Sequence, residues 1–251
     1  MEINIKQLNA KFDYGYEYQG NNGRLVVTPL TDRAYMTLTN ALDMKRGGAP
    51  QGPAGTGKTE TVKDLGKNLA FYVVISNCAP TMTSETLAQN FQGLASAGCW
   101  GCFDEFNRIL LDVLSVITTY ISSIFEALRQ NRPDAPCTIE DRTFKVKKDC
   151  ALFITMNPGY AGRQELPDNL AALFRPVAMM VPDFQAIAKI ELMAQGFQLS
   201  EKLAGKITTI VDLMSKQLSK QSHYNYGMRE IKSMLRHSGT IKQKNPSYEE
   251  I

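Results

Sequence analysis

The chain has 251 residues, of which 43% are hydrophobic and 21% are charged. This composition is that of a folded globular protein, and it excludes disordered, collagen-like and disulfide-scaffold classes. The formal net charge of +3 is too small to recruit nucleic acid or an anionic membrane to the chain as a whole, so neither is expected as a partner.

Strand-length apolar runs alternate with helical patterns in the first part of the chain. Strands are expected at 72–75, 100–103, 151–155 and 177–181, and helices near 58–69, 84–96, 107–130 and 167–173. This alternation predicts an α/β fold whose mostly parallel sheet is covered by helices on both faces. After Pro182 only helical spacing remains, which predicts a large α/β domain over residues 1–183 and a small all-helical domain over 184–251.

The run Ile109–Leu128 is as long as a membrane span. It carries Asp112 and Glu126, and its apolar residues recur with a helical period, so we expect a buried amphipathic helix and no membrane segment. Residues 131–136 are predicted to form the loop that ends this helix, and the alternation near 144–147 is compatible with a hairpin over 138–148.

Five cysteines form an odd set, and residues 1–11 lack the apolar core of a secretory signal. Both features indicate a reducing, intracellular compartment. Cys99 and Cys102 have the spacing of a redox dithiol or a zinc half-site, but no second cysteine pair completes a zinc site, and Cys102 is expected inside a strand. We interpret both as core residues.

The phosphate-loop pattern G-x-x-x-x-G-K-[ST] is met in full by Gly52-Pro53-Ala54-Gly55-Thr56-Gly57-Lys58-Thr59. Its glycines would let backbone N–H groups surround phosphates, Lys58 would reach the β and γ oxygens, and Thr59 would place a hydroxyl on Mg²⁺. The alternative is a glycine-rich turn at a helix start, which does not require the whole pattern. Residues 47–51, just before the loop, are a poor strand by propensity.

A pair of carboxylates, Asp104 and Glu105, ends the strand expected at 100–103. Beside a phosphate loop, Asp104 would hold Mg²⁺ through water and Glu105 would activate the attacking water. Alone, such a pair is more often a helix cap. Glu105 favours a hydrolase over a phosphoryl transferase, because a transferase uses the hydroxyl of its substrate as nucleophile.

Two amides and two arginines stand where they could complete the site. Asn157 ends the strand at 151–155 and would touch the γ-phosphate or the lytic water, although a turn residue before proline is an equal alternative. Asn77 would hydrogen-bond Glu105 in the absence of nucleotide, or cap a helix. Arg175 would project from a sheet edge toward a neighbouring module, and Arg229 would reach the γ-phosphate from the helical lid, although a solvated arginine is the simpler interpretation of each.

These motifs, in this order, resemble the AAA+ ATPases, and more closely the first AAA+ module of the dynein heavy chain. The resemblance covers about the whole chain. Its most specific segments are Phe12–Tyr18, Leu25–Arg33, Gly52–Thr61, Cys102–Ile109, Ile154–Arg163 and Leu166–Val181. Asn77–Thr81 and Gln51 depart from the family pattern, which leaves open whether the heavy chain is cytoplasmic, axonemal or intraflagellar.

The resemblance implies an ATP- and Mg²⁺-dependent module, an α/β phosphate-loop core with a helical lid, in a ring of six unequal modules on one polypeptide. Asn157 would then be the first sensor, Arg229 the second, and Arg175 a finger for the neighbouring site. By the same resemblance, Val26 and Val27 line the adenine pocket. The implied nucleotide-binding set is Val26, Val27, Pro53, Ala54, Gly55, Thr56, Gly57, Lys58, Thr59, Glu60, Asn157 and Arg229.

The resemblance further implies a minus-end-directed microtubule motor on cytoplasmic microtubules or in the axoneme of a cilium or flagellum. Its partners would be neighbouring AAA+ modules, the linker, the microtubule through a stalk that this chain lacks, and dynein intermediate and light chains. The chain itself is expected to be a monomer, a fragment that binds nucleotide tightly and turns it over slowly. The alternative is a regulatory module with little or no turnover.

Overall fold

The computed structural model describes residues 3–21, 23–130, 132, 134–157, 165–219, 221, 224 and 226–245. The chain divides into two compact units, Met1–Met180 and Val181–Ile251. This division falls three residues before the domain boundary expected from the sequence.

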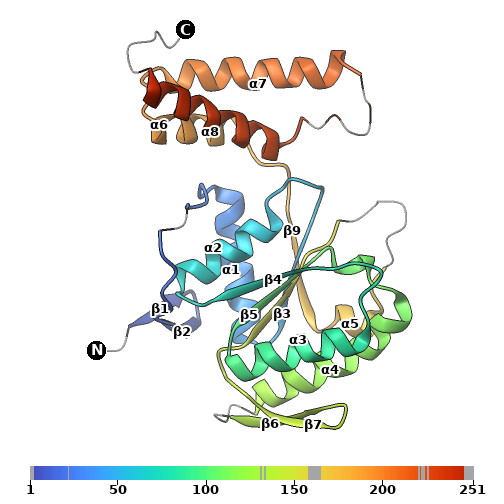
Figure 1. Cartoon of the computed structure of the whole chain (residues 1–251). Coiled ribbons are helices and arrows are strands. Elements are labelled where there is room, and N and C mark those ends of the chain that lie inside the picture. Colours follow the sequence, from blue (N-terminus) through green and yellow to red (C-terminus); the bar gives the residue numbers. More distant parts are fainter. Residues whose placement is uncertain are drawn as a thin grey trace. The chain divides into compact units, whose positions relative to one another are not determined.

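The first unit is built on a parallel sheet of five strands in the order β4-β5-β8-β3-β9 (Figure 1). In chain order the strands are β3 (Gly47–Gln51), β4 (Val73–Asn77), β5 (Trp100–Asp104), β8 (Ala151–Ile154) and β9 (Phe174–Ala178). The parallel α/β fold predicted from the alternating pattern is confirmed.

The segment that propensity rates as a poor strand, residues 47–51, is the inner strand β3. Its glycines are needed for packing, since a Cβ on Gly47 would lie 2.3 Å from the Phe174 ring and a Cβ on Gly48 would lie 2.4 Å from Leu38. Because these glycines have no side chain, Phe174 and Leu38 can pack directly against the backbone of β3. This packing outweighs the low intrinsic strand propensity of glycine.

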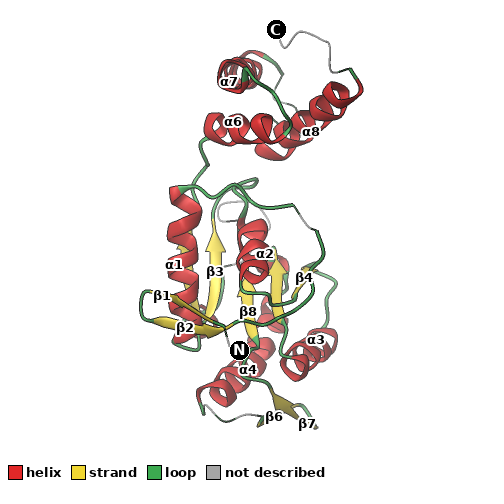
Figure 2. Cartoon of the chain, turned by 90° about the vertical axis from the view of Figure 1, so that its left-hand side faces the viewer, coloured by secondary structure: helices red, strands yellow, loops and turns green. Residues whose placement is uncertain are grey.

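Helices cover both faces of the sheet (Figures 1 and 2). The helices α1 (Pro29–Asp43) and α2 (Lys58–Asn68) share a buried cluster with Trp100, Cys102 and Phe153. On the other face, α3 (Ser84–Ala97), α4 (Leu111–Arg129) and the short α5 (Asp168–Ala171) share a second cluster with Leu152 and Ile154. Successive residues of β8 therefore point to opposite faces, as the pleat of a strand requires.

Among the described residues, α4 is the one helix whose length and composition would allow it to cross a membrane. Its apolar side is occupied within the unit, because Leu114, Ile117, Ile121 and Ile124 are at most 1% exposed and belong to the core. This is the buried amphipathic helix expected from its period. It starts later than expected, after a short 3₁₀ turn, η1 (Phe106–Arg108).

Two antiparallel hairpins flank the sheet. The first pairs β1 (Asn4–Gln7) with β2 (Ala10–Asp13), and the second pairs β6 (Ala135–Ile139) with β7 (Arg142–Val146). The second hairpin matches the expected one but begins in the segment interpreted as a loop, 131–136, of which 131 and 133 lie outside the described residues. Pro136 fits there because a two-stranded hairpin leaves one edge of each strand unpaired.

The second unit contains α6 (Phe184–Ala194), α7 (Ser200–Gln217) and α8 (Met228–Lys244). Their small core consists of Ala188, Leu192, Ala204, Ile231 and Leu235. Asp183 caps α6 by accepting hydrogen bonds from the backbone N–H groups of Gln185 and Ala186. The helices expected after Pro182 are thus present.

Candidate nucleotide-binding site

The phosphate loop connects β3 to α2 at the carboxyl edge of the sheet. Gly55 (φ 79°) and Gly57 (φ 83°) are left-handed, a conformation in which glycine is least strained. Gly52 is buried, and a Cβ there would lie 2.2 Å from the carbonyl oxygen of Met179. Pro53, Ala54, Gly55 and Glu60 are exposed, and the buried Thr56 donates its hydroxyl to the Pro53 carbonyl (3.0 Å).

Lys58 lies in the first turn of α2 with only 7% of its surface exposed. Its Nζ donates to the carbonyl oxygens of Gly52 (2.9 Å) and Pro53 (2.7 Å), so the ammonium is held over the loop. Because α2 has 11 residues, its N-terminal N–H groups and dipole add positive potential at the same place. This is a cradle for an anion.

The oxygens predicted to hold Mg²⁺ meet at the end of β5. Thr59 Oγ1 donates to Asp104 Oδ1 at 2.9 Å, and the buried Thr155 hydroxyl donates to the same oxygen. Mg²⁺ prefers oxygen ligands, and usually takes one or two from protein and the others from water and phosphate. No cluster of three or more His, Cys, Asp or Glu suited to a metal occurs among the described residues. A hydroxyl beside one carboxylate is the kind of sparse oxygen set that fits Mg²⁺.

Glu105 directly follows β5 and has a left-handed backbone (φ 54°), which costs a non-glycine residue about 1–3 kcal/mol. Its backbone N–H donates to Thr155 Oγ1 (3.1 Å), so one threonine hydroxyl joins both carboxylate residues. The Glu105 side chain accepts from Arg108 Nη1 at 2.8 Å and from Asn157 Nδ2 at 3.4 Å. The strained backbone of Glu105 is therefore held in place by contacts from η1 and from the residues that follow β8.

Asn157, three residues beyond β8, is buried, and its carbonyl accepts from Asn107 Nδ2 (3.4 Å). The amide next to Glu105 is therefore Asn157. Asn77 is exposed, and no hydrogen bond joins it to Glu105 in the part of the chain that the structure describes, so the expected Asn77 contact is not found in this conformation. Residues 158–163, part of the motif after Asn157, lie outside the described residues.

The remaining predicted residues belong to three other segments of the chain. Val26 is half-buried and Val27 is 57% exposed, in the segment before α1. Arg175 is exposed within β9, an edge strand of the sheet, which begins earlier than the strand expected at 177–181; the following Pro176 is tolerated because one side of an edge strand is unpaired. Arg229 is exposed in the first turn of α8, in the second unit.

The cysteines near this site, Cys78, Cys99 and Cys102, are packing residues rather than nucleophiles or metal ligands. Cys102 is buried in β5, and Cys99 is partly buried beside the core. Burial, together with the nearby Asp104 and Glu105 carboxylates, raises the pKa of the Cys78 thiol to about 12. A thiol that stays protonated is neither a nucleophile nor a metal ligand.

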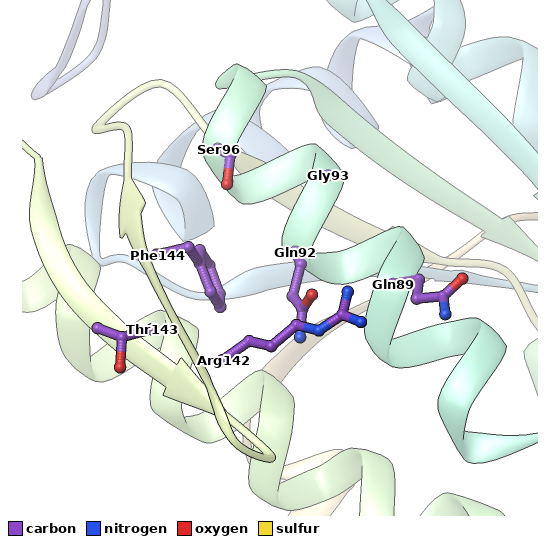
Figure 3. Close-up of a pocket in the computed structure, with 7 residues that line it drawn as sticks. All are labelled: Gln89, Gln92, Gly93, Ser96, Arg142, Thr143 and Phe144. Carbon is purple, nitrogen blue, oxygen red and sulfur yellow. The ribbon is translucent and has the colours of Figure 1, made fainter.

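A hollow elsewhere in the unit lies between α3 and β7 (Figure 3). Its lining includes Gln89, Gln92, Arg142 and Phe144. Since α3 ends just before β5 begins and β7 ends just before β8 begins, the hollow is near the amino ends of those strands, opposite the phosphate loop. It contains none of the predicted nucleotide-binding residues.

Two buried polar side chains near the predicted site residues were not identified from the sequence. Thr155 directly follows the apolar strand β8, and only the pairing of β5 with β8, which brings the ends of the two strands together, reveals that its hydroxyl meets Asp104. Asp64 lies within α2 as one of several charged residues, and its burial could not be inferred from spacing.

Comparison with known proteins agrees with this geometry. Residues 14–251 match the family model described as the hydrolytic ATP binding site of the dynein motor region. The chain is 55% identical, over 99% of its length, to dynein axonemal heavy chain 1 of Mus musculus and of Homo sapiens. It is 51% identical, over 96% of its length, to the dynein-1-beta heavy chain of the flagellar inner arm I1 complex of Chlamydomonas reinhardtii.

The chain spans 5–6% of the length of these relatives. The family match, in contrast, covers nearly all of the chain, and the parallel sheet with a phosphate loop followed by C-terminal helices is the expected architecture. The chain therefore belongs to the family of the hydrolytic ATP-binding site of the dynein motor region, an ATPase module of the AAA+ type.

Proposed function

We propose that this module binds MgATP at the carboxyl edge of its sheet and hydrolyses it with water activated by Glu105. One observation carries the proposal: Thr59 contacts Asp104 and Asn157 contacts Glu105, so residues from three separate segments converge beside the phosphate loop. A structural loop without ligand would not require this convergence of carboxylates, amide and hydroxyl.

The phosphates would lie against the backbone N–H groups of residues 53–59, with Lys58 neutralising their charge. Thr59 and Asp104 would hold Mg²⁺, Asp104 through water. When bound, Mg²⁺ neutralises charge on the phosphate oxygens and orients them. Thr155 keeps the Asp104 carboxylate in place by donating its hydroxyl to Oδ1.

Glu105 would take the proton of the attacking water, and Asn157 would orient that water or the terminal phosphate. In the described conformation Glu105 is paired with Arg108 at 2.8 Å. The carboxylate must leave this pair, or share it, before it can accept a proton from water.

The second unit would serve as the helical lid, carrying Arg229 as a second sensor, with the α/β core over residues 1–183 and the lid over 184–251. Val26 and Val27 would form a wall for adenine. Arg175, exposed on an edge strand, would act on the site of a neighbouring module, and the corresponding arginine for this site would come from another module.

In the longer protein, the module would drive a minus-end-directed microtubule motor. The identities of 51–55% to axonemal and flagellar heavy chains favour an axonemal heavy chain located in a cilium or flagellum. Its partners would be the adjoining modules and linker of the same polypeptide, microtubules, and the intermediate and light chains of a dynein complex. ATP, ADP and Mg²⁺ are its proposed ligands.

The test combines nucleotide binding with single-turnover hydrolysis. We expect Lys58→Ala to abolish MgADP binding, and Glu105→Gln to retain binding while lowering the hydrolysis rate by at least a hundredfold. The matched controls are Lys63→Ala, an exposed lysine of the same helix, and Glu85→Gln, an acidic residue in the first turn of α3. Both controls should behave as the parent chain.

A regulatory module without turnover is the second candidate, favoured by the Arg108 pair that restrains Glu105. It predicts binding that Lys58→Ala abolishes, together with no hydrolysis above that of Glu105→Gln. If the folded parent chain binds neither MgADP nor MgATP, both candidates are wrong for the isolated chain.

A further inference from the structure

A buried carboxylate that takes no part in the proposed chemistry lies midway along α2. Asp64 is 6% exposed and accepts three hydrogen bonds: from the Leu25 backbone N–H to Oδ1 (3.1 Å), and from Tyr35 Oη (2.7 Å) and Asn68 Nδ2 (3.0 Å) to Oδ2. Burial, the hydrogen bond to Asp64 and its charge raise the pKa of the Tyr35 hydroxyl, so this hydroxyl remains a donor.

The three donors come from different parts of the chain. Tyr35 belongs to α1, Asn68 to α2 itself, and Leu25 to the irregular segment 23–28 that precedes α1. Two further contacts tie this segment to α2: Arg24 Nη2 donates to Asn68 Oδ1 (3.3 Å), and Lys67 Nζ donates to the Gly23 carbonyl (3.2 Å). The segment is thus attached to the phosphate-loop helix at three consecutive residues, and the Leu25 contact is partly buried whereas the other two are exposed.

The order of α1, β3 and α2 in the chain places the end of segment 23–28 near the phosphate loop. The helix α1 runs into β3 through a turn of three residues, so the start of α1 lies at the edge of the sheet where β3 ends, which is the edge of the loop. Tyr35 and Asp64 each lie six residues beyond the first residue of their helix and meet at equal depth below that edge. From Leu25 the chain therefore passes by Val26 and Val27 back to the edge, where Thr28 caps α1.

We propose that Asp64 is a positioning residue for base recognition: its carboxylate fixes the backbone of Leu25, so that Val26 and Val27 are held as an apolar wall for adenine. The inference rests on the proposed function, since it concerns the same nucleotide site. Val27 is 57% exposed, which leaves apolar surface for a flat base to cover. Because Asp64 and Lys58 share one helix, the base wall and the phosphate cradle keep a fixed separation.

The chemistry requires a carboxylate. Each oxygen of Asp64 only accepts, and together they accept from three donors. In Asp64→Asn the amide nitrogen would face at least one of these donors whichever way it is turned. With the amide oxygen on the Leu25 N–H, the nitrogen faces Tyr35 and Asn68, so the Tyr35 hydroxyl must turn to accept and the Asn68 contact is lost. With the oxygen on the other side, the Leu25 N–H loses its acceptor. The expected consequence is a looser segment 23–28 in a chain that still folds.

The test compares ligands that use the base wall with one that does not. MgADP and MgGDP contain a base, whereas magnesium tripolyphosphate offers the phosphate loop alone. By titration calorimetry, Asp64→Asn should weaken MgADP about tenfold, because the base wall must then be ordered when the nucleotide binds. The preference for MgADP over MgGDP should shrink, while the affinity for tripolyphosphate should stay within about twofold.

Two further variants strengthen the test. Asn68→Ala, at an exposed position, removes one donor to Asp64 and the partner of Arg24, and should weaken MgADP about two- to threefold without affecting folding. The control is Thr118→Val, which removes an equally buried hydroxyl bond in α4 (2.8 Å to the Leu114 carbonyl) and should leave all three affinities unchanged.

Three outcomes would overturn the inference. The first is a folded Asp64→Asn or Asn68→Ala that binds MgADP as the parent does. The second is a parallel loss of MgADP and tripolyphosphate affinity, which would indicate general damage to the phosphate loop. The third is a parent chain that binds tripolyphosphate but does not distinguish MgADP from it, which refutes the base wall and leaves the phosphate site standing. Failure of the parent to bind any of the three refutes the proposed function itself.

Discussion

Replacing Thr155 with valine is expected to damage both the stability of the α/β unit and its hydrolytic step. The hydroxyl is fully buried, donates to Asp104 and accepts from the Glu105 backbone N–H at 3.1 Å. Valine keeps the shape but leaves the N–H and the carboxylate without this partner. An unsatisfied buried group costs about 1–3 kcal/mol, so we expect a loss near 2 kcal/mol in the free energy of unfolding.

For a unit of this size, each kcal/mol corresponds to about 2–4 °C, so the thermal midpoint should fall by roughly 4–8 °C. The catalytic effect should be larger. Glu105 depends on Thr155 to hold its left-handed backbone, and a displacement of about 1 Å in a catalytic group can cost up to about 10²-fold in rate. MgATP affinity should fall less than the rate, because Lys58 and the loop are bonded independently of Thr155 and only the proposed Mg²⁺ contact of Asp104 depends on it.

The assay is single-turnover hydrolysis at saturating MgATP, with differential scanning calorimetry of the same samples. Thr155→Ser retains the hydroxyl and serves as the matched variant, expected within about threefold of the parent in rate. The reasoning would be refuted by a Thr155→Val chain that hydrolyses ATP as fast as Thr155→Ser, or by equal losses in both variants. The second result would assign the effect to the lost methyl group.

Three other outcomes are expected. Arg108→Gln removes the partly exposed ion pair with Glu105, so it should change the free energy of unfolding by less than about 1 kcal/mol. Basal ATP hydrolysis should rise up to about fivefold, because the Glu105 carboxylate is released from the pair. A slower variant would show that Arg108 assists catalysis. Gly52→Ala puts a Cβ 2.2 Å from the Met179 carbonyl and should lower MgADP affinity and thermal midpoint together, in a calorimetric comparison with the parent. Burial raises the pKa of Cys78 to about 12, so its contribution to stability is complete below pH about 9 and is lost toward pH 12; in alkaline denaturation, Cys78→Ala should flatten this decline.

Sequence patterns predicted the elements better than their packing. The phosphate loop, the carboxylates after a strand and the helical C-terminal part all follow from local patterns. The strand β3 was rated poor because propensity counts residues one at a time, whereas Gly47 and Gly48 are required by the rings of Phe174 and Phe153 that pack over them. Information of this kind resides in the tertiary neighbours.

The same limit applies to the site. Asp104 and Asn157 could be identified because they end strands, and parallel strands end at one edge. Thr155 and Asp64 could not, because their importance depends on register and helix rotation: one faces a carboxylate across two strands, and the other is the buried acidic side chain of a helix that also carries exposed ones. Asn77 satisfied the strand-end rule and still lies exposed, so that rule alone does not establish a contact.

The way the chain leaves the sheet has a mechanical consequence. Just past β9, Met179 donates its backbone N–H to the Gln51 carbonyl (2.6 Å), at the foot of the phosphate loop, and the second unit begins at Val181. The polypeptide that joins the two units is therefore fastened to the loop two residues before it departs. Gly52 also packs against the Met179 carbonyl, so Met179 contacts the start of the loop through both its N–H and its carbonyl oxygen. A displacement of the loop backbone at this point would be passed directly to the main chain that leads into the second unit.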